Sequence, residues 1–195
     1  MGITKDDNRK WILRVDEISN GIKVPEDLAL KIKVMLDWEN SRPDEKITEI
    51  LSKINCHKAV LYLLGLISYF ELTSHPKEES FDFTYSQDAL AISDKEFTLV
   101  KNEEELRHLV NLNCEASKIC VGQILNEGLA HSFIVGKVED ANKFICFDKA
   151  GFIENLKKGN KDFKFGVYEI NELLKNPNYQ NAKWRFVLID AVLPR

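Results

Sequence analysis

The chain of 195 residues lacks several features that would each point to a class of protein. No apolar run reaches the roughly 18–20 residues that span a bilayer, so no membrane span is expected. The net charge is −4, and without a basic surplus nucleic-acid binding has little support. The first residues, MGITKDDNRK, lack the apolar segment of a signal peptide. A cytoplasmic location is therefore the default prediction, with signal-independent secretion left open.

Cysteine and metal-binding motifs are also sparse. The four cysteines form no CxxC pair, and the chain has no HExxH motif, so neither a cofactor nor a metal is implied. Without an export signal, the cysteines are expected to be reduced rather than disulfide-bonded. Three of them, Cys114, Cys120 and Cys146, are expected to pack in the core.

The pattern of the chain changes from helical to β along its length. Helical periodicity is found at 25–38, 44–53 and, after Asn102, 102–112. Strand patterns are found near 97–100, 118–125, 131–136, 143–148, 163–170 and 183–192, with a helical turn at 172–175. The polar residues 71–88 predict a loop. This order predicts an α+β fold in one domain, 1–195, with a helical lobe over 1–54 and a core over 55–195 that ends in an antiparallel sheet.

The most apolar stretch is residues 55–70, which has no charge beyond Lys58. A segment that is apolar on all sides predicts a buried, central helix. Asn55 is a good N-cap residue, which would place Cys56 in the first turn. There the helix dipole and the unpaired backbone N–H groups favour thiolate over thiol. Cys56 is therefore the candidate nucleophile.

A predicted hairpin supplies the other half of a site. Alternation along the strand places His131 on the same face as Phe133 and Val135. The expected register pairs Val135 with Phe144, Phe133 with Cys146 and His131 with Asp148. In that register the Asp148 carboxylate can accept a hydrogen bond from the imidazole, whereas a slip of one residue would separate them.

In this arrangement cysteine, histidine and aspartate would each have a separate role in acyl chemistry. His131 would take the thiol proton and later protonate the leaving group. Asp148 would fix the tautomer of the imidazole and favour its charged form. The backbone N–H of Cys56 would contribute to an oxyanion hole, because it is an unpaired donor at the helix end.

The order of these motifs resembles that of papain-like cysteine peptidases, and most closely the compact bacterial branch that includes cell-wall amidopeptidases. Three motifs carry the resemblance: Asn-Cys-His at 55–57, Ala-His-Ser-Phe-Ile-Val at 130–135, and Phe-Ile-Cys-Phe-Asp-Lys-Ala-Gly at 144–151. It implies a papain-like fold and a thiol hydrolase that cleaves an amide, peptide or ester bond. Papain-type members also use a glutamine upstream of the cysteine as an oxyanion donor. This chain has no glutamine before Gln87, and Asn55 could replace it only if it is not occupied as the cap.

Other interpretations stay open at this point. The same chemistry with an amine acceptor would be acyl transfer, as in a transglutaminase-type enzyme. A chain without the upstream glutamine could instead be a non-catalytic module that binds a protein or peptide. Cys56, His131 and Asp148 could also ligate zinc. His57 is an alternative base, but neighbouring helix residues point about 100° apart, so direct pairing with Cys56 is not expected.

Overall fold

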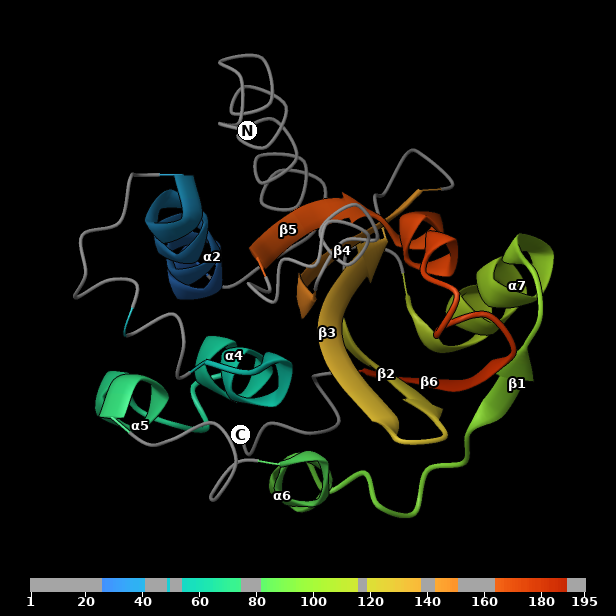
Figure 1. The fold of residues 1–195 in the computed structure, drawn as a ribbon, viewed down its shortest axis with the longest axis horizontal. Helices are drawn as coiled ribbons and strands as arrows, with labels where there is room; N and C mark the ends of the chain where they lie inside the picture. Colours follow the sequence, from blue (N-terminus) through green and yellow to red (C-terminus); the bar gives the residue numbers. More distant parts are fainter. Residues whose placement is uncertain are drawn as a thin grey trace.

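The computed structural model describes residues 26–40, 49, 54–74, 82–115, 119–137, 143–150 and 164–188. The described helices are α2 (Glu26–Asn40), α4 (Cys56–Leu63), α5 (Tyr69–Ser74), α6 (Phe83–Ala89), α7 (Glu103–Asn113) and the 3-10 helix η1 (Ile170–Lys175). The strands are β1 (Thr98–Val100), β2 (Ile119–Asn126), β3 (Leu129–Lys137), β4 (Phe144–Ala150), β5 (Lys164–Glu169) and β6 (Ala182–Leu188). The predicted α+β class is confirmed (Figure 1). The helix expected at 44–53 lies outside the described residues, apart from residue 49.

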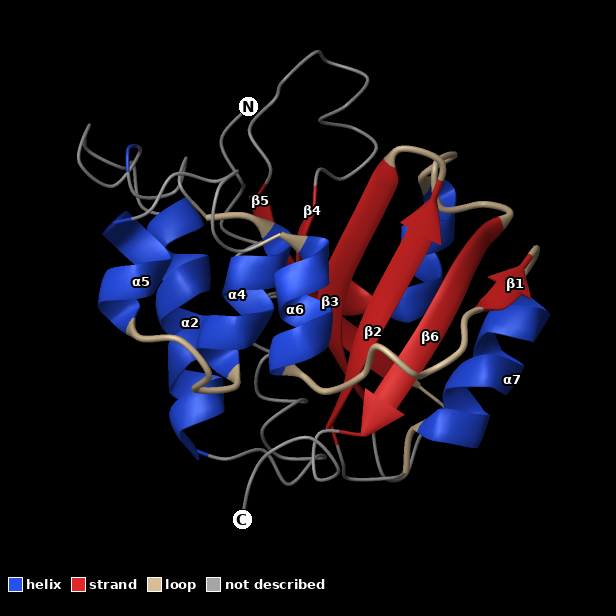
Figure 2. Cartoon of the chain, turned by 90° about the horizontal axis from the view of Figure 1, so that it is seen from below, coloured by secondary structure: helices blue, strands red, loops and turns tan. Residues whose placement is uncertain are grey.

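The described strands form one six-stranded sheet in the order β1-β6-β2-β3-β4-β5. Every neighbouring pair is antiparallel. Helices α2, α4, α5 and α6 gather on one side of this sheet, whereas α7 lies beyond β1 and β6 on the other (Figure 2). Among the described residues, no helix combines the length and apolar character needed to cross a bilayer.

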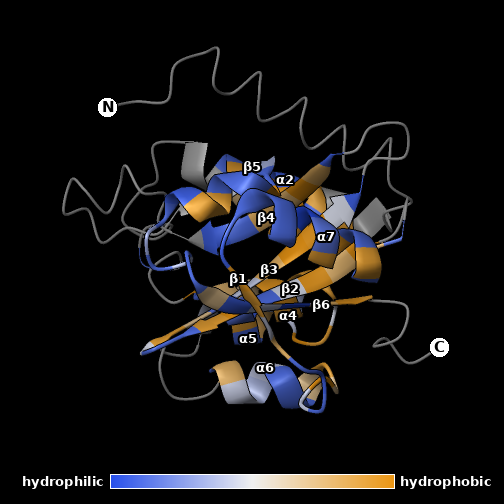
Figure 3. Cartoon of the chain, turned by 90° about the vertical axis from the view of Figure 1, so that its right-hand side faces the viewer, coloured by the Kyte–Doolittle hydropathy of each residue, from blue (hydrophilic) through white to orange (hydrophobic). Residues whose placement is uncertain are grey.

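Hydrophobic cores lie on both faces of the sheet, and successive strand residues contribute to them in turn. On β3, Ile134 joins the core beneath α2 and α4, whereas its neighbours Phe133 and Val135 join the core that includes α7 and η1. Strands β2, β4 and β5 divide their residues in the same way, and hydrophobic colouring dominates β3 and β6 (Figure 3). This two-residue period is the expected consequence of strand geometry in a sheet that is covered on both faces.

The long central helix predicted at 55–70 is wrong in extent. Helix α4 ends in a Schellman motif, in which Leu66 N–H donates to Leu61 C=O at 2.9 Å and Gly65 N–H donates to Tyr62 C=O at 3.0 Å. Gly65 adopts the positive φ of 74° that this motif requires. The apolar pattern did not reveal the break, and Phe70, expected to be buried, is 70% exposed.

Part of the predicted loop at 71–88 is also helical. Ser68 and Glu71 form a capping box at the start of α5: Glu71 N–H donates to Ser68 Oγ at 3.2 Å, and Ser68 N–H donates to Glu71 Oε2 at 2.7 Å. Asp82 then caps α6 by accepting from the N–H of Tyr85 at 2.8 Å. Local side-chain caps therefore start helices in a stretch whose apolar periodicity is weak.

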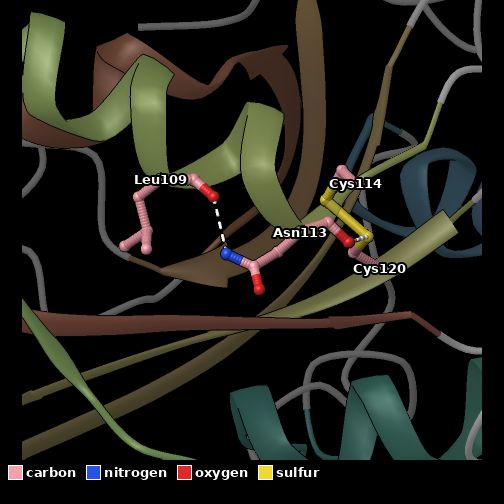
Figure 4. Close-up of a disulfide and its surroundings, with 4 residues drawn as sticks. All are labelled: Leu109, Asn113, Cys114 and Cys120. Carbon is pink, nitrogen blue, oxygen red and sulfur yellow. Dashed lines mark hydrogen bonds between the residues drawn. A yellow bond between two sulfur atoms is a disulfide. The ribbon is translucent and has the colours of Figure 1, made fainter.

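Two of the cysteines expected to be reduced are paired. Cys114, which ends α7, forms a disulfide with Cys120 on β2 (Figure 4). Cys56 and Cys146 are not disulfide-bonded. The separation of six residues in the sequence did not indicate a disulfide between Cys114 and Cys120, because the bond depends on how α7 packs against the sheet.

Counting thiols tests this disulfide directly. Unfolding the protein in guanidinium chloride without a reductant should expose two reactive thiols, Cys56 and Cys146. Adding a reductant first should raise the number to four, which intact-mass spectrometry after alkylation measures. Four labelled cysteines without reductant would show that Cys114 and Cys120 are not bonded in the protein as isolated.

Candidate active site

The candidate nucleophile begins the helix that packs on the centre of the sheet. Asn55 caps α4, with its Oδ1 accepting from the N–H of Lys58 at 2.8 Å. Cys56 is the first residue of the helix and is partly exposed, and α4 packs against β3 and β4. The predicted cap and first-turn cysteine are thus confirmed. The side-chain oxygen of Asn55 serves as the cap of α4. Asn55 was expected to act as an oxyanion donor only if it did not cap the helix, so we assign it the capping role.

His131 and Asp148 meet on the sheet, as predicted, but in a different register. His131 Nε2 lies 2.9 Å from Asp148 Oδ2, and both side chains are buried. The ladder pairs Phe133 with Asp148 and Val135 with Cys146, two residues away from the expected register. A slip of two residues keeps every side chain on its face, so alternation alone could not distinguish the two registers. His131 therefore reaches Asp148 diagonally across the two strands.

The same imidazole also contacts the thiol. The Cys56 thiol and the His131 imidazole lie close enough to shift each other's pKa, and Nε2 of the imidazole is already used by Asp148. The nitrogen that faces the sulfur is therefore Nδ1. His131 thus bridges the cysteine and the carboxylate, and the three predicted residues lie together in one site.

Two aromatic rings hold this imidazole in place. The ring of Tyr179 stacks on His131 with centroids 5.4 Å apart and an interplanar angle of 10°. On the same imidazole, the ring of Phe133 stacks at 5.7 Å and 23°. Burial raises the pKa of the Tyr179 phenol, and the nearby negative charges of Asp148 and Cys56 raise it further. Tyr179 is thus a neutral ring that limits the motion of His131 and shields it from water.

The electrostatics of the site favour an ion pair between Cys56 and His131. Burial raises the pKa of the Cys56 thiol, but the neighbouring imidazoles of His57 and His131 outweigh it and hold this pKa well below its ordinary 9.0. Burial lowers the pKa of His131, but the charges and hydrogen bonds of Cys56 and Asp148 raise it to about 10 from an ordinary 6.5. The site therefore favours the thiolate–imidazolium pair over the neutral thiol and imidazole.

A second histidine lies at the thiol, contrary to expectation. The imidazole of His57 lowers the pKa of the Cys56 thiol and places its Nδ1 2.8 Å from Ser132 Oγ. Consecutive residues of α4 thus contact consecutive residues of β3: Cys56 meets His131, and His57 meets Ser132. The angle of about 100° between neighbouring helix side chains did not indicate that His57 would influence the Cys56 thiol.

Sequence reasoning missed a buried polar chain that continues from Ser132. Gln123 Nε2 donates to Ser132 Oγ at 3.0 Å, and Arg185 Nε donates to Gln123 Oε1 at 2.9 Å. All three side chains are buried, and the ladders pair Gln123 with both of the others. The sequence did contain one indication of this chain, because Gln123, Ser132 and Arg185 each interrupt an apolar run at a core-facing position. The three runs are ICVGQILN, HSFIV and WRFVL.

The geometry above is the basis for any functional assignment. Comparison with protein-family models, curated proteins and solved structures found no match to this chain. Among the described residues, no group of three or more histidine, cysteine, aspartate or glutamate side chains is placed to hold a metal ion.

A glycine beneath Phe133 offers a test of the ring packing at His131. A Cβ added at Gly122 would lie 2.3 Å from Phe133 Cζ, so Gly122→Ala must displace the ring that stacks on His131. We expect a loss of about 1–3 kcal/mol in the free energy of unfolding, measured by urea denaturation, and slower alkylation of Cys56 at pH 6. The double variant Gly122→Ala/Phe133→Leu restores room and should recover part of the stability. Unchanged stability in the single variant would contradict the packing.

Proposed function

We propose that this protein is a papain-like thiol hydrolase that cleaves an amide, peptide or ester bond through an acyl-enzyme. The observation that carries the proposal is the position of His131, whose Nε2 lies 2.9 Å from Asp148 Oδ2 and whose pKa is raised by the neighbouring Cys56 as well as by Asp148. A nucleophile at the start of a helix, packed on an antiparallel sheet whose neighbouring strands carry the imidazole and the carboxylate, gives further support.

The resting ion pair supplies both the nucleophile and the acid. The Cys56 thiolate attacks the acyl carbon, and a sulfur–carbon bond forms as the π pair of the carbonyl moves onto oxygen. When that pair returns, the bond to the leaving nitrogen or oxygen breaks. The leaving group then takes the proton from His131 Nδ1.

Water completes the cycle. It gives a proton to His131 as its oxygen adds to the acyl carbon, and collapse of this second adduct releases the acid and the Cys56 thiolate. Asp148 stays ionised throughout and holds the imidazolium in place. An amine in place of water would give acyl transfer by the same steps.

The rate of alkylation of Cys56 by iodoacetamide against pH tests this proposal. The wild-type rate should rise at a pH well below 9, as the thiol with its lowered pKa ionises. It should rise again near pH 10, where His131 loses its proton and the unpaired thiolate becomes more nucleophilic. Peptide mapping by mass spectrometry identifies the labelled cysteine.

The His131→Ala variant is the control for this profile. Without the imidazolium, the low-pH reactivity should be lost, and one rise should remain nearer the ordinary thiol pKa of about 8.5. If wild-type Cys56 already behaves as an ordinary thiol, or if His131→Ala leaves the profile unchanged, the hydrolase proposal fails. The fold would then be better interpreted as a binding module.

A further inference from the structure

The second histidine at the thiol has one ring nitrogen whose role follows from its surroundings. His57 is 7% exposed, and its ring lies 5.6 Å from that of Phe83. Nδ1 is taken up by Ser132 Oγ at 2.8 Å. Because Nδ1 is occupied, Nε2 is the ring nitrogen left for the neighbouring Cys56 thiol, whose pKa this imidazole lowers. Whether Nε2 carries a proton depends on which way the hydrogen bond to Ser132 runs.

Arg185 determines, through Gln123, which partner donates in the hydrogen bond between Ser132 and His57. A guanidinium group can only donate, and Arg185 donates to Gln123 Oε1 through Nε at 2.9 Å and Nη2 at 2.6 Å. The amide of Gln123 is thereby oriented with its oxygen toward the arginine. Its Nε2 then donates to Ser132 Oγ at 3.0 Å and to Ser86 Oγ at 3.3 Å.

The hydrogen bond from Gln123 in turn determines how Ser132 interacts with His57. Its oxygen accepts from Gln123, and its own hydroxyl proton needs an acceptor because the side chain is fully buried. His57 Nδ1 is that acceptor. An imidazole that accepts at Nδ1 carries its proton at Nε2. The network therefore presents an N–H donor from His57 to the space around the Cys56 sulfur.

We propose that His57 Nε2–H is the side-chain donor of the oxyanion hole, and that it acts together with the backbone N–H of Cys56. This inference rests on the thiol-hydrolase function proposed above. It supplies the donor that papain-type members take from an upstream glutamine and that this chain lacks. Ser132, Gln123 and Arg185 are positioning residues, because they act on the reaction only through His57.

The donor follows the negative charge during acylation. In the resting site, Nε2–H donates to the thiolate. When the sulfur–carbon bond forms, the carbonyl π pair moves to oxygen, and the N–H moves its hydrogen bond from sulfur to the new oxyanion. When the pair returns to re-form the carbonyl, the bond to the leaving group breaks and His131 supplies the proton. His57 thus gains and loses no proton over the cycle.

Two probes of the same thiol separate this role from a structural one. p-Nitrophenyl acetate acylates Cys56 through an oxyanion, whereas iodoacetamide alkylates it by displacement at a saturated carbon, without one. His57→Phe should slow acylation by about 100-fold or more, while the plateau of the alkylation–pH profile stays within about threefold of wild type. At the plateau of the alkylation–pH profile the thiol is fully ionised in each variant, so a changed pKa of Cys56 does not affect the comparison.

Conservative variants complete the experiment, with the background of Cys56→Ala subtracted throughout. His57→Gln can place an amide N–H near the position of Nε2 and should recover a large part of the acylation rate. Ser132→Ala removes the group that orients His57 without adding volume, and it should slow acylation about tenfold with the alkylation plateau retained. This second variant keeps the test valid if His57→Phe does not fold.

The outcomes distinguish the two levels of the proposal. Selective loss of acylation in His57→Phe with recovery in His57→Gln supports His57 as the donor. Equal loss of acylation and alkylation, or no loss in either, overturns it while leaving Cys56 and His131 as they are. A wild-type Cys56 no faster than an ordinary thiol with both probes removes the hydrolase function, and the oxyanion role with it.

Discussion

Asp148→Ala should slow the acylation of Cys56 by p-nitrophenyl acetate by about 100-fold or more at pH 6, the scale of a lost acid–base function. The carboxylate is 2% exposed and lies 2.9 Å from His131 Nε2. Without it, the buried imidazolium keeps only the thiolate as a partner of opposite charge. The pKa of His131 should then fall from about 10 toward its ordinary 6.5, and the pKa of Cys56 should rise.

Asp148→Asn is the matched control, because the amide can still accept a hydrogen bond but carries no charge. We expect a smaller loss, roughly tenfold, which corresponds to about one pKa unit in the ion pair. Alanine and asparagine variants that both react like wild type at pH 6 would show that Asp148 does not support the imidazolium.

Local signals in the sequence were sufficient for the parts of the site that depend on local geometry. The Asn55 cap fixed the position of Cys56 at the start of α4, because capping depends on neighbours along the chain. The common face of His131 and Asp148 followed from strand alternation, although the register was wrong by two residues. A prediction that depends only on the face of the sheet a residue occupies is unchanged by a register shift of two residues. The proximity of His131 and Asp148 was therefore predicted correctly.

The remainder depends on contacts between distant segments. His57, Ser132, Gln123 and Arg185 are spread over four separate elements, and each is polar in a buried position. In the sequence alone, each looks like an isolated interruption of an apolar run. Their function in the fold emerges only when the sheet order places β6 beside β2 and β2 beside β3. The Cys114–Cys120 disulfide escaped prediction for the same reason.

Arg185→Met should cause the largest loss of stability among the substitutions considered, about 3 kcal/mol in the free energy of unfolding. The guanidinium is 3% exposed and donates to Gln123 Oε1 and, at 2.8 Å each, to the carbonyls of Ile92 and Lys95. It also stacks over the ring of Phe97 at 4.2 Å. Methionine fills much of the volume but leaves three acceptors, of which the Gln123 and Ile92 oxygens are buried, without this donor.

Urea denaturation of Arg185→Met beside Arg107→Met measures this effect against an exposed arginine. Arg107 pairs with Glu103 at 3.1 Å on the surface of α7, so its loss should change stability by less than about 1 kcal/mol. Arg185→Lys should fall in between, because it keeps the charge without the planar fork. A loss below about 1 kcal/mol in Arg185→Met would show that the buried acceptors find other donors.

The same substitution links the stability of the sheet to the chemistry of the site. Without Arg185, the Gln123 amide keeps Ser86 and Ser132 but loses the donors to its Oε1, so its orientation toward Ser132 is held less firmly. Arg185→Met should therefore slow acylation of Cys56 in a folded sample, whereas adding Arg185→Met to His57→Phe should slow it no further. Additive losses in this double-mutant cycle would mean that the arginine stabilises the sheet without orienting His57.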